Sequence, residues 1–176
     1  MLLSIQQRYI LETVQTLGYI QRRQLHILTQ RKFQATGYRI SEAAMNAMLR
    51  QLRACQQDIR LDDLGVWIAG FQPNPLHLEA LDVMLELSGD IPAEFHLGAS
   101  TPILLRFTLD EPKVRLFTVA ELSVNTPVTL ERQRMERIVW ISEGGCAPPD
   151  LTLPPKHFFA ARQSDGSHRF YGSEEP

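Results

Sequence analysis

The stretch "SEAAMNAMLRQLRAC", residues 41–55, predicts an amphipathic helix that continues to about residue 56. Ser41 suits the N-cap position, because its hydroxyl can accept a hydrogen bond from a backbone N–H of the first turn. Apolar residues recur at intervals of three and four, as on the buried side of a helix: Ala44, Met45, Met48, Leu49, Leu52 and Cys55. A second row is predicted to project from the other side of the helix: Asn46, Arg50, Arg53 and Gln57.

The residues around this helix predict a small domain of three helices and a β-hairpin over 2–71. Apolar spacing indicates a first helix over 3–16, ended by Gly18, which can adopt the left-handed conformation that closes a helix. Tyr19–Ile20 is expected to be a short extended segment, followed by a second helix over 21–30 and a connection over 31–40. Downstream, two short strands within 59–71 flank the turn "DDLG", as in a hairpin. The prolines of "QPNP", 72–75, separate this domain from the rest.

Three helices followed by a hairpin form the layout of a winged helix-turn-helix domain, in which the third helix enters the major groove. The segments "QQRYILETVQTLGYIQRRQLHIL" and "MLRQLRAC" resemble the N-terminal part of the replication-relaxation proteins of bacterial mobile elements and related uncharacterised families. The likeness covers about 65 residues. The positions that match are Gln24, Leu25, Arg50, Leu52 and Arg53. The resemblance implies a DNA-binding regulator or accessory factor of a mobile genetic element, with the 41–56 helix reading DNA.

Under this interpretation the outward row contacts bases and phosphates. Arginine can bond guanine through two hydrogen bonds, and asparagine can pair in the same way with adenine. Phosphate contacts, which set register rather than sequence, could come from other basic residues: Arg22, Arg23, Arg31, Lys32 and Arg60. The alternative is that the row is a solvated helix face.

The formal charge of −2 conceals opposite signs in the two halves of the chain. Residues 1–71 contain nine Lys and Arg against five Asp and Glu, which gives +4, and residues 72–176 contain nine against fifteen, which gives −6. A basic N-terminal half admits a nucleic acid partner, whereas the acidic half disfavours phosphate.

The second half predicts a small mixed α/β domain over 76–172, so that the whole chain is α+β. Its expected elements are a helix at 76–89, adjacent strands at 94–109 and 113–124, a helix at 126–137, a buried strand at 138–142, and a hairpin at 156–172.

This order of elements is also the core order of restriction-endonuclease-like folds, and the replication-relaxation resemblance implies the same fold. Such an enzyme needs two acids around Mg²⁺ and a nearby lysine. Asp110 and Glu121 are the candidate acids, but residue 123 is serine where the lysine should stand, so the nuclease alternative is a degenerate protein and no enzymatic activity is expected. A third interpretation is a protein-interaction or dimerisation module that does not bind DNA.

No metal or cofactor is expected, because no two histidines have metal-ligand spacing: they are His26, His77, His96, His157 and His168. No apolar run approaches the roughly 20 residues of a membrane span, and the N-terminus lacks the features of a signal peptide. Cys55 and Cys146 are far apart in sequence. We therefore expect a cytoplasmic protein that binds double-stranded DNA and could form a homodimer.

Overall fold

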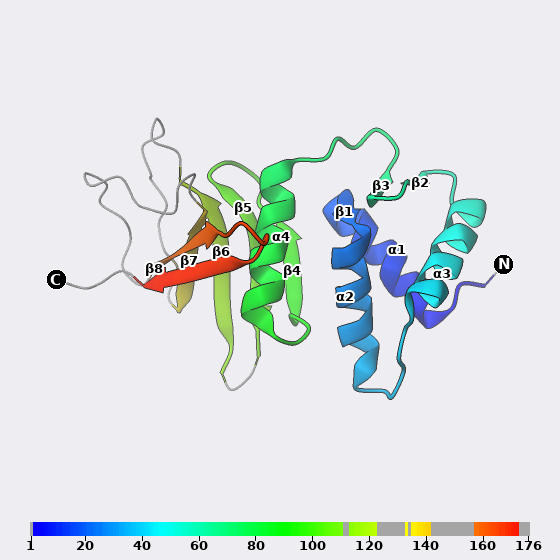
Figure 1. The fold of residues 1–176 in the computed structure, drawn as a ribbon, viewed down its shortest axis with the longest axis horizontal. Coiled ribbons are helices and arrows are strands. Elements are labelled where there is room, and N and C mark those ends of the chain that lie inside the picture. The colour runs from blue at the N-terminus through cyan, green and yellow to red at the C-terminus, as the bar shows by residue number, and fades with distance from the viewer. Residues whose placement is uncertain (1, 111–112, 123–132, 134, 142–156, 173–176) are drawn as a thin grey trace. The chain divides into compact units, whose positions relative to one another are not determined.

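The computed structural model describes the chain except for residues 1, 111–112, 123–132, 134, 142–156 and 173–176 (Figure 1). The chain divides into two compact units, Met1–Leu78 and Glu79–Pro176, and the helix that follows the predicted linker spans this boundary. The protein is a mixed α+β structure, as expected from the sequence. None of the helices in the described part of the chain is long and apolar enough to cross a membrane.

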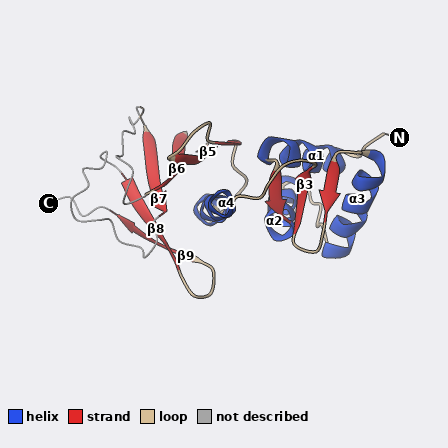
Figure 2. Ribbon diagram, turned by 90° about the horizontal axis from the view of Figure 1, so that it is seen from above, coloured by secondary structure: helices blue, strands red, loops and turns tan. Residues whose placement is uncertain are grey.

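Unit 1 combines three helices with a small antiparallel sheet. Its elements are α1 (Ile5–Leu17), β1 (Tyr19–Gln21), α2 (Arg22–Gln34), α3 (Glu42–Cys55), β2 (Ile59–Leu61) and β3 (Gly65–Ile68). The strand order is β1-β3-β2, and both outer strands are antiparallel to β3. Figure 2 shows the three helices packed beside this sheet. The short extended segment expected after Gly18 is therefore a paired strand.

The first helix ends at Gly18, as the sequence predicts. The backbone of Gly18 has φ of +70°, a conformation that costs glycine little, and its N–H donates to the Val14 carbonyl oxygen over 2.8 Å. A Cβ atom at this position would lie 2.2 Å from Cε2 of Phe71, so the aromatic ring fills the space that a side chain would need. Glycine at residue 18 thus allows both the backbone conformation that ends α1 and the close packing of the Phe71 ring.

The second helix is longer than predicted, and the connection after it is shorter. The helix α2 continues to Gln34, because Phe33 is buried and prolongs its apolar side by one turn. The segment leading to α3 is then held on α2 by Ile40. Its N–H donates to Oε1 of Gln30, and its carbonyl oxygen lies 2.7 Å from Nε2 of His26.

The third helix begins as predicted, with Oγ of Ser41 accepting the N–H of Ala44 over 3.2 Å. Its buried stripe is narrower than expected. Three side chains are buried, and they are Met45, Leu49 and Leu52. Ala44 and Cys55 are exposed, because both lie about 100° around the helix from the centre of the buried stripe, so their predicted burial is wrong.

The expected hairpin is formed by β2 and β3. Oδ1 of Asp62 accepts the N–H groups of Leu64 and Gly65 over 2.8 and 2.7 Å, which fixes the turn. The second strand ends at Ile68 rather than at Phe71, because Gly70 with φ of +87° turns the chain.

Unit 2 is a six-stranded mixed sheet with α4 alongside it (Figure 1). Its elements are α4 (Pro75–Ser88), β4 (Glu94–Leu97), β5 (Ile103–Leu109), β6 (Arg115–Glu121), β7 (Glu136–Ile141), β8 (His157–Arg162) and β9 (His168–Gly172). The strands lie in sequence order; β6, β7 and β8 are parallel, and the remaining neighbours are antiparallel.

The predicted apolar strand at 138–142 corresponds to β7, whose residues Ile138 to Ile141 are all buried and which has a parallel neighbour on each side. The predicted final hairpin is also present as β8 and β9. The stretch 94–109 is not one strand, because residues 98–102 turn between β4 and β5. The predicted helix at 126–137 falls mostly outside the described residues, but its end is wrong: Glu136 already begins β7.

Candidate nucleic-acid interface

The outward row predicted on α3 is partly confirmed by the structure. Asn46, Arg50 and Arg53 are exposed, and each follows a buried residue by one position, so the row flanks the buried stripe at about 100° around the helix. Gln57 does not extend this row. It follows the C-cap residue Gln56 and lies in the turn before β2, so the prediction that it projects with the helix is wrong.

Arg22 connects this row to two other elements. Its Nη2 donates to Oδ1 of Asn46 on α3 over 2.5 Å, and its Nη1 donates to the carbonyl oxygen of Asp62 over 3.1 Å. The backbone N–H of Arg22 also donates to the Leu64 carbonyl oxygen over 3.0 Å. One residue therefore joins the start of α2, the middle of α3 and the β2–β3 turn.

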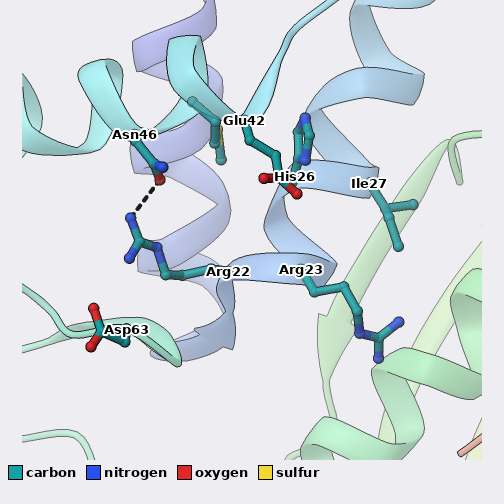
Figure 3. Close-up of a pocket in the computed structure, with 8 residues that line it drawn as sticks. Arg22, Arg23, His26, Ile27, Glu42, Asn46 and Asp63 are labelled. Atoms are coloured by element: carbon teal, nitrogen blue, oxygen red, sulfur yellow. Dashed lines mark hydrogen bonds between the residues drawn. The ribbon is translucent and has the colours of Figure 1, made fainter.

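A pocket of about 310 Å³ opens around these contacts (Figure 3). It is lined by Arg22, Arg23, His26, Ile27, Glu42, Met45, Asn46 and Asp63. In Figure 3, the Arg22 and Asn46 side chains point toward each other, whereas Arg23 extends away from Asn46. The structure thus brings Arg22 together with the α3 row and places Arg23 on the rim.

Three other predicted phosphate-binding residues either lie far from Arg22 along α2 or form contacts within the domain. Arg31 and Lys32 belong to the last turn of α2; at 1.5 Å per residue, Arg31 is about 14 Å along the helix from Arg22. The ammonium group of Lys32 lies 5.8 Å from the centre of the Tyr9 ring. Nη1 of Arg60 donates to the carbonyl oxygens of Gln57 and Ile59.

The β2–β3 turn is acidic rather than basic. Asp62 and Asp63 are both exposed, and Leu64 beside them is 74% exposed. The N–H groups of Gly65 and Leu64, with a smaller contribution from Arg22, hold the pKa of Asp62 below its usual range, so this carboxylate stays charged. The charged turn therefore disfavours phosphate beside it.

The two candidate nuclease acids are not brought together. Leu109 pairs with Arg115, so Asp110 lies beside the β5–β6 turn, whereas Glu121 lies at the far end of β6. Seven residues at about 3.3 Å each separate the two ends of that strand by roughly 20 Å. Asp110 and Glu121 cannot bind the same metal ion. The serine at 123 lies outside the described residues.

Sequence reasoning missed one polar cluster, centred on His168 of β9. The side chain of His168 is 1% exposed; Nδ1 lies 3.1 Å from Oε1 of Glu86, and Nε2 lies 3.4 Å from Oε1 of Glu79. The spacing of seven residues between the two acids places them on one side of α4 and was the available signal. The carboxylates face opposite ring nitrogens and do not converge on one point. Across the described parts of the chain, no group of three or more His, Cys, Asp and Glu is placed to hold a metal ion.

The remaining histidines have separate surroundings. His96 is exposed on β4, at the edge of the sheet, and His157 meets Phe159 edge-on with ring centres 5.2 Å apart. Burial lowers the pKa of His77. These residues do not form a site with one another in the described chain.

Comparison of the chain with protein-family models, with curated proteins and with solved structures found no match. What the protein does must therefore be inferred from its own residues. Within unit 1, Asn46, Arg50 and Arg53 form an exposed polar row on α3, and Arg22 is bonded to Asn46 of that row.

Proposed function

We propose that unit 1 is a winged helix-turn-helix domain that binds double-stranded DNA through the exposed face of α3. The observation that carries the proposal is the division of α3 into a buried stripe and an exposed face with two arginines and an asparagine. Helices that read the major groove need this division, because one side must anchor the helix in the domain while the other contacts the nucleic acid. Given the resemblance to replication-relaxation proteins, the protein would act as a regulator or accessory factor of a mobile genetic element.

Charge supports α3 as the contact surface. Residues 1–71 carry +4. Arg50 and Arg53 are exposed, and neither forms an ion pair within the described chain. Both guanidinium groups are therefore available for phosphates or for guanine, which they can bond through two hydrogen bonds.

The acidic β2–β3 turn restricts the mode of binding. A wing that contacts the DNA backbone needs neutral or basic residues at its tip, but here Asp62 and Asp63 occupy it. The α3 helix and the start of α2 would make the contacts, and the turn would stay away from the phosphates.

The proposal is tested by measuring the fluorescence anisotropy of labelled random-sequence duplex DNA titrated with the full chain. Arg50→Ala with Arg53→Ala should weaken binding strongly. The matched control is Arg8→Ala with Arg39→Ala, which removes the same charge from exposed residues outside α3 and should weaken binding less. Equal affinities for the two double variants would contradict a contact surface on α3.

A protein-interaction module is the second candidate, and the turn itself favours it. An exposed leucine between an acidic pair and a glycine is suited to a protein partner with an apolar, basic surface. If this is the function, the full chain should show no affinity for duplex DNA at low salt, and, where the partner is a second copy of the chain, Leu64→Ser should abolish self-association measured by sedimentation.

A further inference from the structure

The three-stranded sheet of unit 1 has an outer face that does not contribute to the core. The core-facing residues of the sheet are at most 2% exposed, and they include Ile20, Val66 and Ile59. Side chains alternate between the two faces along a strand, so the residues next to these project outward. They are Tyr19, Trp67 and Arg60, and the strand register places Tyr19 and Arg60 on either side of Trp67. The outer face therefore carries one row across β1, β3 and β2.

The two aromatic residues of this row form a joint surface, here called the aromatic platform. The ring centres of Tyr19 and Trp67 are 5.9 Å apart, and the ring planes differ by 31°. The hydroxyl end of the Tyr19 ring lies over Gly65, where a Cβ atom would overlap it, so the ring extends from β1 onto β3. Both aromatic residues are partly exposed. A flat partner from solution can thus reach the platform.

Arg60 adds a positive charge beside Trp67. It is exposed and forms no ion pair within the described chain. Its Nη1 donates to the carbonyl oxygens of Gln57 and Ile59, which holds the guanidinium group near β2 and leaves its charge uncompensated. The acidic turn lies beyond Gly65, where Asp62 accepts that N–H group. An anion is therefore favoured at Arg60 and disfavoured at the turn.

An aromatic surface next to an arginine matches the chemistry of a nucleotide. The base can stack on the rings while the phosphate pairs with the guanidinium group. Bases inside a duplex present only their edges, so stacking on the platform requires an unpaired base. The charge of +4 on residues 1–71 favours a nucleic acid as the occupant.

We propose that the outer face of this sheet binds single-stranded nucleic acid, with a base stacked on Tyr19 and Trp67 and a phosphate at Arg60. This site uses none of the α3 residues, so the proposal goes beyond the proposed function and does not depend on it.

The experiment titrates the full chain with single-stranded oligothymidine and oligouridine of about 12 nucleotides. Tryptophan fluorescence reports stacking directly, because a base on the Trp67 ring quenches its emission, whereas Trp140 is fully buried in unit 2. Anisotropy of labelled oligonucleotides gives the affinity. Thermal melts of each variant accompany the titrations, because an aromatic pair across two strands also stabilises a sheet.

The wild-type chain should bind with quenching, and the oligonucleotide bound more tightly identifies the natural strand as DNA or RNA. Trp67→Phe should keep most of the affinity and lose the quenching. Trp67→Leu and Tyr19→Leu should each weaken binding by about tenfold. The matched control is Tyr38→Leu, which removes a 59% exposed tyrosine outside the sheet and should leave the affinity unchanged.

Arg60 is tested through salt. Arg60→Met should flatten the plot of log K against log salt concentration by about 0.7, the value for one phosphate contact with a single strand. Arg50→Ala with Arg53→Ala on α3 should leave oligonucleotide binding unchanged.

Three results would overturn the proposal. The first is the absence of quenching by both oligonucleotides at low salt, which would leave the face to a protein partner or to solvent. The second is quenching that persists in Trp67→Phe. The third is equal affinity of the wild-type chain and a folded Trp67→Leu variant. Duplex binding is measured separately on the same chain, so failure of the proposed function is distinguished from failure of this proposal.

Discussion

Replacing Glu86 by alanine should destabilise unit 2, because Glu86 joins α4 to the edge strand β9. One carboxylate oxygen accepts the backbone N–H of His168 over 2.8 Å, and the other lies 3.1 Å from Nδ1 of the same residue. A hydrogen bond to a charged group contributes about 1.5–3 kcal/mol. The side chain of His168 is 1% exposed, so water cannot replace both oxygens of Glu86 as acceptors in the variant. The side chain of Glu86 is 31% exposed, so each hydrogen bond should contribute an energy near the lower end of this range. We expect the unfolding free energy to fall by about 3 kcal/mol.

Two matched variants separate the contributions. Glu86→Gln keeps an acceptor for the backbone N–H and removes the charge, so it should lower the unfolding free energy by about half as much as Glu86→Ala. Glu94→Ala removes an exposed carboxylate from β4 and should change stability by less than about 0.5 kcal/mol.

The assay is urea unfolding of the full chain in a Trp67→Phe background, monitored by tryptophan fluorescence. Trp140 in β7 then reports on unit 2 alone, since the chain has two tryptophans and Trp67 belongs to unit 1. An unfolding midpoint for Glu86→Ala equal to that of Glu94→Ala would refute the argument that this carboxylate holds β9.

Other changes test the packing of unit 1. Leu49→Ala should cost about 2–5 kcal/mol because Leu49 is fully buried, whereas Arg50→Ala on the exposed side should stay within about 0.5 kcal/mol; calorimetric melts of both variants check this, and equal melting temperatures would contradict the assigned faces. Gly18→Ala should lower the melting temperature more than Arg50→Ala does, because its Cβ would overlap the Phe71 ring and its φ is positive; an unchanged melt would refute this role. Burial raises the pKa of Tyr9 from 10.0 to about 12, so the unfolded chain releases this proton first, and stability should fall as pH rises through that interval. Urea unfolding across that range should show the fall in the wild-type protein, and a Tyr9→Phe variant with the same fall would contradict it.

Local features of unit 1 could be predicted from the sequence because each depends on neighbouring residues. Gly18 ends α1 through its own backbone conformation, and Ser41 begins α3 through a bond three residues away. The exposed face of α3 follows from helical spacing alone, so Arg50 and Arg53 were placed correctly. Gln57 was misplaced because spacing does not show where a helix ends.

Features that depend on distant residues could not be predicted. The strand β1 exists because Tyr19 pairs with Trp67, which lies far along the chain. The contact between His168 and Glu86 joins residues 82 positions apart, and no local pattern around His168 indicates it. The bond from Arg22 to Asn46 likewise joins two helices, and no local pattern in the sequence indicates it.

The salt dependence of DNA binding tests the central claim most directly. The full chain and Arg50→Ala with Arg53→Ala are titrated against random duplex DNA at salt concentrations from about 50 to 200 mM, and log K is plotted against log salt concentration. Removing one phosphate contact should flatten the slope by about 0.9. If both arginines contact phosphates, the slope of the double variant should be flatter by about 1.8, with a melting temperature near that of the wild-type protein. No measurable affinity of the wild-type chain at about 50 mM salt, or an unchanged slope in the double variant, would contradict the account and leave the α3 row as a solvated helix face.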